Sequence, residues 1–214
     1  MRVTFAKGHQ LKYISHLDLA LTWVRALRRA GVPLAYSQGY NPHARLQLAS
    51  GLPLGYTGAA EVMDVILTTP VPSQEFITCV EPTLPEGLSI ARAEEVLLKA
   101  PSLQSALRLA AYRVMVETAL TEEDLNQRVA NLLAADQIEQ KRTRKGRVET
   151  FDLRPLIDDV RLEASSDGQA VFSMRLSAGQ HGNVRPDAVL AALDLGDAFA
   201  QVERTRLWFE FDSL

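Results

Sequence analysis

The order of apolar segments along the chain constrains the fold most, because the same order occurs twice. Segments that alternate apolar and polar residues, as strands do, are separated by segments whose apolar residues recur every three to four positions, as in helices. In the first half, strand, helix, strand, strand, helix and strand are predicted at residues 2–7, 15–31, 46–49, 61–67, 73–80 and 88–93. In the second half, the same order is predicted at residues 112–117, 122–140, 160–164, 171–176, 187–193 and 205–211.

This order of elements predicts the fold class. Strand crossovers through helices are nearly always right-handed, so the order folds into a ferredoxin-like sandwich. We therefore predict an α+β protein of two tandem ferredoxin-like (βαββαβ) halves, each an antiparallel sheet with helices on one face. The N-terminal half is expected at residues 1–98 and the C-terminal half at residues 110–214. Asp167-Gly168 predicts the hairpin turn between the two middle strands of the second half.

The first helix has a clear start and an apolar face. Ser15 is followed three residues later by Asp18, the spacing of a capping box that satisfies free backbone donors. The helix is expected to end near Gly31. Its predicted core face consists of Leu17, Ala20, Val24 and Leu27.

Composition and charge narrow the class of protein. Apolar residues make up 47% of the chain and charged residues 23%, which is ordinary for a globular protein and argues against disorder. The lone cysteine, Cys79, cannot form an intramolecular disulfide and fits a reducing compartment. No segment approaches the ~20 apolar residues of a membrane span. We expect a soluble cytoplasmic protein without a signal peptide, and the net charge of -3 means that any phosphate-binding surface must be local.

The loop at residues 36–45 is the main candidate for ligand binding. Gly39, Asn41 and Pro42 predict turns, and two aromatic side chains lie among neutral hydrogen-bonding ones. Aromatic rings can stack on unpaired bases, while amides and hydroxyls can read base edges. An elaborate turn needs the same mixture of residues. The predicted ligand-binding residues are Tyr13, His16, Arg25, Arg29, Tyr36, Ser37, Gln38, Tyr40, Asn41, His43 and Arg45.

Two histidines are candidates for proton transfer. His16 lies in the first turn of the predicted helix, where the helix dipole favours a neutral ring, and His43 lies in the loop. With Tyr13 and Lys12, they could cleave RNA without a metal, one group deprotonating a 2'-hydroxyl and another protonating the leaving oxygen. The alternative is that His16 is a hydrogen-bonding residue at the helix end and His43 completes a turn. No metal or nucleotide cofactor is predicted, because no tight ligand spacing or phosphate-binding glycine motif is present.

A second group of basic residues follows the long helix predicted in the second half. Such a run could contact phosphates, or it could be a solvated loop that complements the helix C-terminus. The predicted basic patch consists of Lys141, Arg142, Arg144, Lys145, Arg147 and Arg154.

Several motifs resemble one known family along nearly the whole chain. They are YISHLD at residues 13–18, RALRRAG at 25–31, YSQGYNPH at 36–43, LPLG at 52–55 and PEGL at 85–88. Together they resemble the radical-SAM-linked bacterial domain of unknown function, which is often fused to or encoded beside a cobalamin-binding radical S-adenosylmethionine (SAM) protein. The resemblance implies a radical SAM enzyme as partner. The chain itself lacks the three-cysteine cluster motif of such enzymes.

The sequence therefore leads to one hypothesis and two alternatives. The hypothesis is an accessory module, without catalytic activity of its own, that recognises a substrate for a radical SAM enzyme, with RNA as the candidate substrate. The predicted layout is also similar to that of the CRISPR repeat-processing endoribonucleases, so a metal-independent endoribonuclease using His16 and His43 is one alternative. A protein-protein adaptor that contacts protein through the loop is the other.

Overall fold

The computed structural model describes residues 1–144, 147–180 and 182–212. Contacts divide the chain into two units. Unit 1 comprises Met1–Leu107 and the segment from Arg204 onward, and unit 2 comprises Arg108–Glu203. The last strand, β10 (Ala200–Phe209), therefore begins in unit 2 and ends in unit 1.

Unit 1 contains most of the predicted site residues. Its further elements are β1 (Arg2–Lys7), η1 (His9–Leu11), α1 (His16–Arg29), β2 (Leu46–Leu48), β3 (Thr57–Val65), α2 (Ser73–Val80), η2 (Glu81–Thr83), β4 (Leu88–Glu94) and α3 (Leu103–Ala106). The sequence prediction of β1 and α2 is confirmed at both ends. Alternation delimits β1, and the turn residues Pro82, Pro85 and Gly87 follow α2. β3 begins four residues earlier than predicted, because residues 57–60 also belong to the strand.

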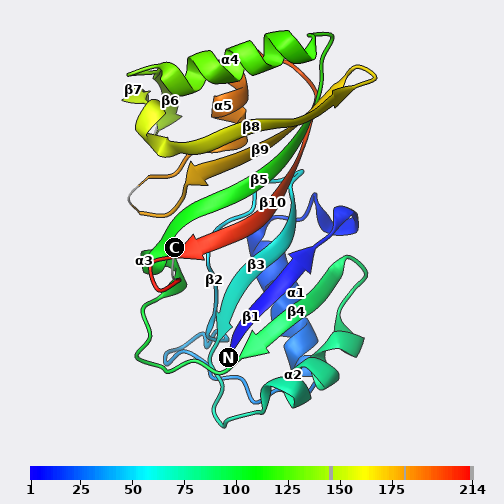
Figure 1. Cartoon of the computed structure of the whole chain (residues 1–214). Helices are drawn as coiled ribbons and strands as arrows, with labels where there is room; N and C mark the ends of the chain where they lie inside the picture. The colour runs from blue at the N-terminus through cyan, green and yellow to red at the C-terminus, as the bar shows by residue number, and fades with distance from the viewer. Residues whose placement is uncertain (145–146, 181, 213–214) are drawn as a thin grey trace. The chain divides into compact units, whose positions relative to one another are not determined.

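The sheet of unit 1 has the order β4-β1-β3, and β2 also pairs with β3 (Figure 1). β1 runs antiparallel to both of its neighbours: Arg2 lies opposite Asp64 of β3 and Glu94 of β4. β2 is antiparallel to β3 as well, with Gln47 opposite Asp64. The protein is thus a mixed α/β structure whose sheet strands pair mostly antiparallel.

Helix α1 packs on this sheet through a face that matches the predicted one only in part: Leu27 is buried as predicted, but Leu17 is not. Trp23 is fully buried, and its ring meets the Phe5 ring edge-to-face with 4.9 Å between centroids. The buried face is formed by Leu19, Trp23, Ala26 and Leu27. Leu17, predicted to lie in the core, is 72% exposed. The prediction failed because apolar residues occur around much of this helix, and the large Trp23 side chain decides which face is buried.

Unit 2 is built from the later elements. They are β5 (Leu107–Glu117), α4 (Glu122–Ala134), β6 (Glu139–Arg144), β7 (Arg147–Asp152), η3 (Arg154–Leu156), β8 (Ile157–Ser166), β9 (Gln169–Ser177) and α5 (Pro186–Ala192). β9 lies between β5 and β8 and is antiparallel to both. The predicted turn between β8 and β9 is confirmed: Asp167 and Gly168 have φ values of 51° and 75°, the left-handed region of a tight hairpin.

The prediction of a long helix over residues 122–140 is wrong. α4 ends at Ala134, and β6 and β7 then form a separate two-stranded sheet. The segment predicted as a basic loop is therefore a hairpin. β6 and β7 were missed because both strands are rich in charged residues. A two-stranded sheet separate from the main one needs no apolar face, so its sequence lacks the apolar–polar alternation that identifies strands.

Candidate functional site

The start of α1 places Tyr13 and His16 beside a glycine-containing connector. Ser15 caps the helix: its Oγ accepts from the Asp18 N–H at 3.1 Å and donates to the Asp18 carboxylate at 2.7 Å. His16 is the first helical residue and is exposed. A Cβ placed on Gly51 would lie 3.9 Å from its Nδ1. A Cβ on Gly55 would lie equally close to the Tyr13 ring. The connector between β2 and β3 therefore lies against both predicted residues.

Three charged side chains are buried in this part of unit 1. Lys7, Glu61 and Arg204 are 1%, 3% and 2% exposed. Arg204 forms a two-pronged ion pair with Glu61, with Nε–Oε1 and Nη2–Oε2 distances of 2.7 and 2.5 Å. The same guanidinium donates to the carbonyl of Gly51 at 3.1 Å. The ion pair thus holds the connector through its backbone.

Lys7 ties the connector to the segment before α1. Its ammonium donates to the carbonyls of Lys12 and Tyr56 at 3.3 and 3.4 Å. Burial lowers the pKa of Lys7; the carboxylate of Glu61 opposes this shift and the guanidinium of Arg204 adds to it. Backbone carbonyls alone are modest compensation for a desolvated ammonium. The network therefore fixes the connector against the segment before α1, although burying these charges costs desolvation free energy.

Sequence reasoning missed this network, although a signal for two of its members was present. Lys7 shares the strand phase of Val3 and Phe5, which are buried. Glu61 shares the phase of Met63 and Val65 in the same way. A charged residue in the apolar phase of a strand predicts a buried charge, which needs a partner. Nothing in the sequence showed that the partner of Glu61 is Arg204, which lies 143 residues away.

The other end of α1 carries exposed arginines. Thr22, Arg25, Arg28, Arg29 and Pro85 line an open hollow of about 600 Å³. Arg29 donates to the carbonyl of Thr83. Within residues 1–144, 147–180 and 182–212, neither Arg25 nor Arg28 has a hydrogen-bond or ion-pair partner. Their charges are therefore available to an anion from solution.

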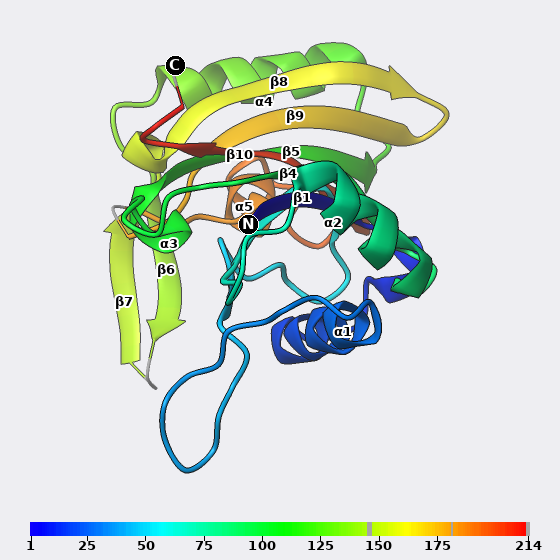
Figure 2. The same ribbon diagram turned by 90° about the horizontal axis from the view of Figure 1, so that it is seen from below.

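The loop at residues 36–45 is closed at its neck and exposed at its tip. The Ser37 N–H donates to the carbonyl of His43 at 2.8 Å, and the His43 N–H donates to the Ser37 Oγ at 3.0 Å. Tyr36 pairs with Ala44 across the same neck. Gln38, Tyr40 and Asn41 are exposed, and Tyr40 is exposed completely. Figure 2 shows the chain after α1 as a long projecting loop.

The predicted residues thus fall into two groups at opposite ends of α1. Tyr13 and His16 lie at its start, whereas Arg25 and Arg29 lie in its last turns. The loop is anchored beyond the helix end, where the Arg45 N–H donates to the carbonyl of Ala35. A helix of this length spans roughly 20 Å. No hydrogen bond of the described residues joins His16 to His43.

Only two side chains of the predicted basic patch, those of Lys141 and Arg154, lie among the described residues. Lys141 is exposed on β6. Arg154 donates to the carbonyls of Leu133 and Ile157 at 3.2 and 3.0 Å, so its guanidinium supports the end of α4. Lys145 lies outside the described residues, and so do the side chains of Arg142, Arg144 and Arg147.

No metal-binding group and no membrane-spanning segment occurs in the described part of the chain. There, three or more His, Cys, Asp or Glu side chains do not gather as a metal would require. No helix in the same residues has the length and apolar character needed to cross a bilayer.

The fold and the site define a mixed α/β protein with a polar loop and a cationic helix end in its first unit. The chain belongs to the family of uncharacterized proteins conserved in bacteria, DUF2344, whose family model matches residues 1–186. The match ends before β10, so Arg204 lies outside it. No protein of curated function matches this sequence.

Two solved structures of complexes that contain Cbf5 and Nop10 match nearly the whole of this chain. A chain in the crystal structure of a Cbf5-Nop10-Gar1 complex is 13% identical, with a TM-score of 0.53, over 99% of this chain and 50% of that one. A chain of an archaeal box H/ACA sRNP Nop10-Cbf5 complex gives 11% identity and a TM-score of 0.48, over 99% and 49% of the two chains. The protein spans about half the length of these chains. At 13% identity the likeness to the first of these chains shows the fold alone.

Proposed function

We propose that this protein is an RNA-recognition module that binds single-stranded RNA at the C-terminal end of α1 and its adjoining loop. The observation that carries the proposal is the pair of exposed arginines, Arg25 and Arg28, which lack a protein partner among the described residues. Guanidinium groups bind phosphates through charge-assisted hydrogen bonds. The fully exposed Tyr40 ring of the loop supplies a surface on which a base can stack.

Unpaired bases suit this surface better than a duplex does. Gln38 and Asn41 are exposed at the loop tip beside Tyr40, and their amides can donate to and accept from base edges. Stacking and edge recognition both need bases that are not buried in a helix. We infer that a looped or unpaired RNA segment is the substrate.

The finer fold assignment belongs to the same proposal. We infer that each unit is a ferredoxin-like half, as predicted for residues 1–98 and 110–214. The strand order β4-β1-β3 with β2 beside β3 supports this for the first half. The order β10-β5-β9-β8 supports it for the second. In each half this order inserts the third strand beside the first, as expected for a βαββαβ unit.

We also propose that the protein serves a radical SAM enzyme. The support is the motif resemblance, whose segments include both Tyr13–Asp18 and the loop at residues 36–43. With one cysteine, the chain cannot itself supply the thiolates of an iron–sulfur cluster. On this account the enzyme performs the chemistry and this protein presents the RNA.

Binding of a fluorescein-labelled oligouridylate at low salt tests RNA recognition. Wild-type protein is expected to bind it, and the R25A/R28A double variant is expected to bind at least about tenfold more weakly, because two phosphate contacts are removed. The matched control is R92A. Arg92 is 70% exposed on β4 and already pairs with Glu94 at 2.6 Å, so its removal should leave affinity unchanged.

The outcomes separate this function from its rivals. Equal affinity of wild type and the double variant would overturn the proposed site. Cleavage of the oligonucleotide in the presence of a chelator, lost in H16A and H43A, would favour the endoribonuclease alternative. Co-purification with a radical SAM protein of the same organism tests the partnership, and failure of the two purified proteins to associate in the presence of RNA would contradict it.

A further inference from the structure

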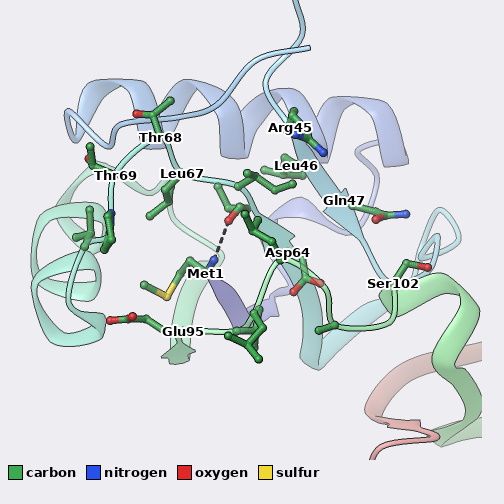
Figure 3. A pocket seen from close by; sticks show the side chains of 18 residues that line it. Met1, Arg45, Leu46, Gln47, Asp64, Leu67, Thr68, Thr69, Glu95 and Ser102 are labelled. Atoms are coloured by element: carbon green, nitrogen blue, oxygen red, sulfur yellow. Dashed lines mark hydrogen bonds between the residues drawn. The ribbon is translucent and has the colours of Figure 1, made fainter. Parts of the chain in front are cut away.

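Two hollows in unit 1 differ in the charges that surround them. One has a volume of about 620 Å³ and lies among the ends of β2 and β3 and the segment between β4 and α3. Figure 3 shows both Arg45 and Glu95 beside it, so its surroundings carry charges of both signs. The other is the open hollow of about 600 Å³ at the last turns of α1, whose lining contains three arginines and no acidic residue. Of the two, the hollow at α1 selects its occupant by charge, and that occupant is an anion.

The three arginines of this hollow form a cluster on α1. Arg28 follows Arg25 by three residues and Arg29 follows it by four, so the three side chains are neighbours on the helix surface. The guanidinium of Arg29 is held in place, because its Nη2 donates to the carbonyl of Thr83 at 2.5 Å. A guanidinium has five N–H donors, so Arg29 keeps others for a ligand. The cluster therefore offers one anion donors from three side chains.

The acidic side chains near this hollow in the sequence do not neutralise it. Asp18 accepts from the Ser15 Oγ at 2.7 Å, and Glu86 accepts from the Gln10 amide at 3.1 Å. Glu81 is exposed and does not line the hollow. Within residues 1–144, 147–180 and 182–212, none of the three arginines forms an ion pair. The hollow thus keeps an uncompensated positive charge.

The helix dipole accounts for only part of the cluster. Cations in the last turn of a helix are stabilised by the partial negative charge at its C-terminus, and this effect falls off within that turn. Arg28 and Arg29 lie in the last turn, whereas Arg25 lies before it. Like charges at this spacing repel one another. Arg25 therefore adds repulsion that the dipole does not offset and that a bound anion removes.

We propose that this hollow binds a terminal phosphate of the RNA, a phosphomonoester at one end of the strand. The inference rests on the RNA-binding function proposed above and names the part of the RNA that the hollow binds. An internal diester carries one negative charge, whereas a monoester carries about −1.5 to −2 at pH 7 and has three acceptor oxygens. Three clustered guanidiniums suit one such group, whereas successive diesters need cations spaced along the strand. Arg29, added to Arg25 and Arg28, then distinguishes a phosphorylated end from a hydroxyl end.

Two pairs of fluorescein-labelled hexauridylates test the inference. In one pair the label is on the 3' end and the 5' end carries a phosphate or a hydroxyl; in the other the label is on the 5' end and the 3' end varies. Fluorescence anisotropy should show the phosphorylated member of at least one pair binding about tenfold or more tightly, because it makes further charge-assisted hydrogen bonds. The pair that shows the preference identifies the end of the strand. Equal affinity within both pairs would overturn the inference.

Replacement of Arg29 tests whether this residue produces the preference. In R29A the ratio of the two affinities should fall below about threefold, and in R29K it should be intermediate, because an ammonium keeps the charge but not the planar set of donors. T83V is the control for local structure. It removes a hydroxyl that donates to two backbone carbonyls and keeps the carbonyl that accepts from Arg29, so the ratio should match wild type. A ratio as low in T83V as in R29A would show that Arg29 acts only through local structure and would contradict the inference.

Thr22 provides a second control within the hollow. Its Oγ1 already donates to the carbonyl of Asp18 at 2.7 Å, so it has no proton left for a phosphate. T22V should therefore leave the preference for the phosphorylated strand unchanged. Loss of the preference in T22V but not in R29A would assign the phosphate to the hydroxyl and contradict the role of the arginines.

The outcomes separate failure of this inference from failure of the proposed function. If the hydroxyl-ended strands bind wild type and lose affinity in R25A/R28A, but neither pair shows a preference, the RNA site stands and the terminal-phosphate inference fails. If no strand binds, both fail. Displacement of the preferred strand by inorganic phosphate or uridine monophosphate, at the concentration at which the unlabelled strand displaces it, would show a site for small phosphates and overturn the assignment to an RNA end.

Discussion

The charged side chains near the two ends of α1 differ in burial and in pairing. Beneath its start, Lys7, Glu61 and Arg204 are buried and bonded to one another or to backbone carbonyls. At its last turns, Arg25 and Arg28 are exposed without a protein partner in the described residues. Buried, paired charges fix a backbone, whereas exposed, unpaired cations are open to an anionic ligand. We therefore assign the first end to positioning and the second to recognition.

The largest effect is expected from removing the buried carboxylate. E61Q leaves the Arg204 guanidinium buried without its counter-charge, which should lower the free energy of unfolding by about 3–5 kcal/mol. Urea denaturation followed by circular dichroism measures it. The control is E94Q, whose ion pair with Arg92 is exposed and should contribute less than about 1 kcal/mol.

A double variant sharpens the same prediction. E61L/R204M replaces both charges with apolar groups and should be more stable than E61Q, because the Arg204 guanidinium is no longer left buried without its counter-charge. If E61Q and E94Q lowered stability equally, the contrast between the two kinds of charge would be wrong.

The next largest effect is expected on RNA binding when the Tyr40 ring is removed from the loop that follows α1. Y40A should weaken oligouridylate binding by about 1–3 kcal/mol, because a stacked base loses its aromatic partner. Its ring is fully exposed, so stability should not change. Y13A is the matched control, since Tyr13 is 74% exposed at the other end of α1. If Y13A weakened oligouridylate binding more than Y40A did, RNA would bind at the start of α1, and our assignment of the two ends would be wrong.

A smaller effect is expected at the helix cap. S15A removes the acceptor of the Asp18 N–H and should lower the free energy of unfolding by about 1 kcal/mol. S73A is a suitable control, because Ser73 begins α2 but makes no cap hydrogen bond. Thermal unfolding should show a lower Tm for S15A, and equal Tm values for the two variants would show that the cap adds nothing to stability.

The smallest effect concerns the pH dependence of stability. Burial lowers the pKa of Lys7 from its ordinary 10.5. Between the lowered pKa and 10.5, the unfolded chain binds more protons than the folded one, so this residue makes stability rise with pH. The difference in unfolding free energy between wild type and K7M should therefore shift in favour of wild type as the pH rises through that window. A difference that does not vary with pH would show that the Lys7 pKa is unshifted.

The sequence predicted elements well where one local signal was strong. β1 and α2 were found at both ends, since alternation delimits the strand and prolines and a glycine follow the helix. The start of α1 followed from Ser15 and Asp18. The buried face of α1 was predicted only in part. Leu27 is buried as expected, but Leu17 and Trp23 offered two apolar faces, and packing against Phe5 selects the second. Tertiary packing decides such cases, not periodicity.

The candidate site was predictable in its residues but not in its geometry. The loop and the helix arginines could be found from turn chemistry and charge alone. The sequence does not show that these residues lie at two separate ends of α1. Only the three-dimensional structure shows which segments lie beside each end, such as the connector that brings Gly51 to His16. The Glu61–Arg204 pair joins residues far apart in the sequence, and one sequence contains no local signal for such a contact.

The salt dependence of RNA affinity tests the central claim most directly. Each phosphate contact to single-stranded RNA contributes about 0.7 to the slope of log affinity against log salt. With both Arg25 and Arg28 on phosphates, the slope for R25A/R28A should be about 1.4 shallower than for wild type, and R92A should match wild type. An unchanged slope in the double variant would contradict RNA binding at the C-terminal end of α1.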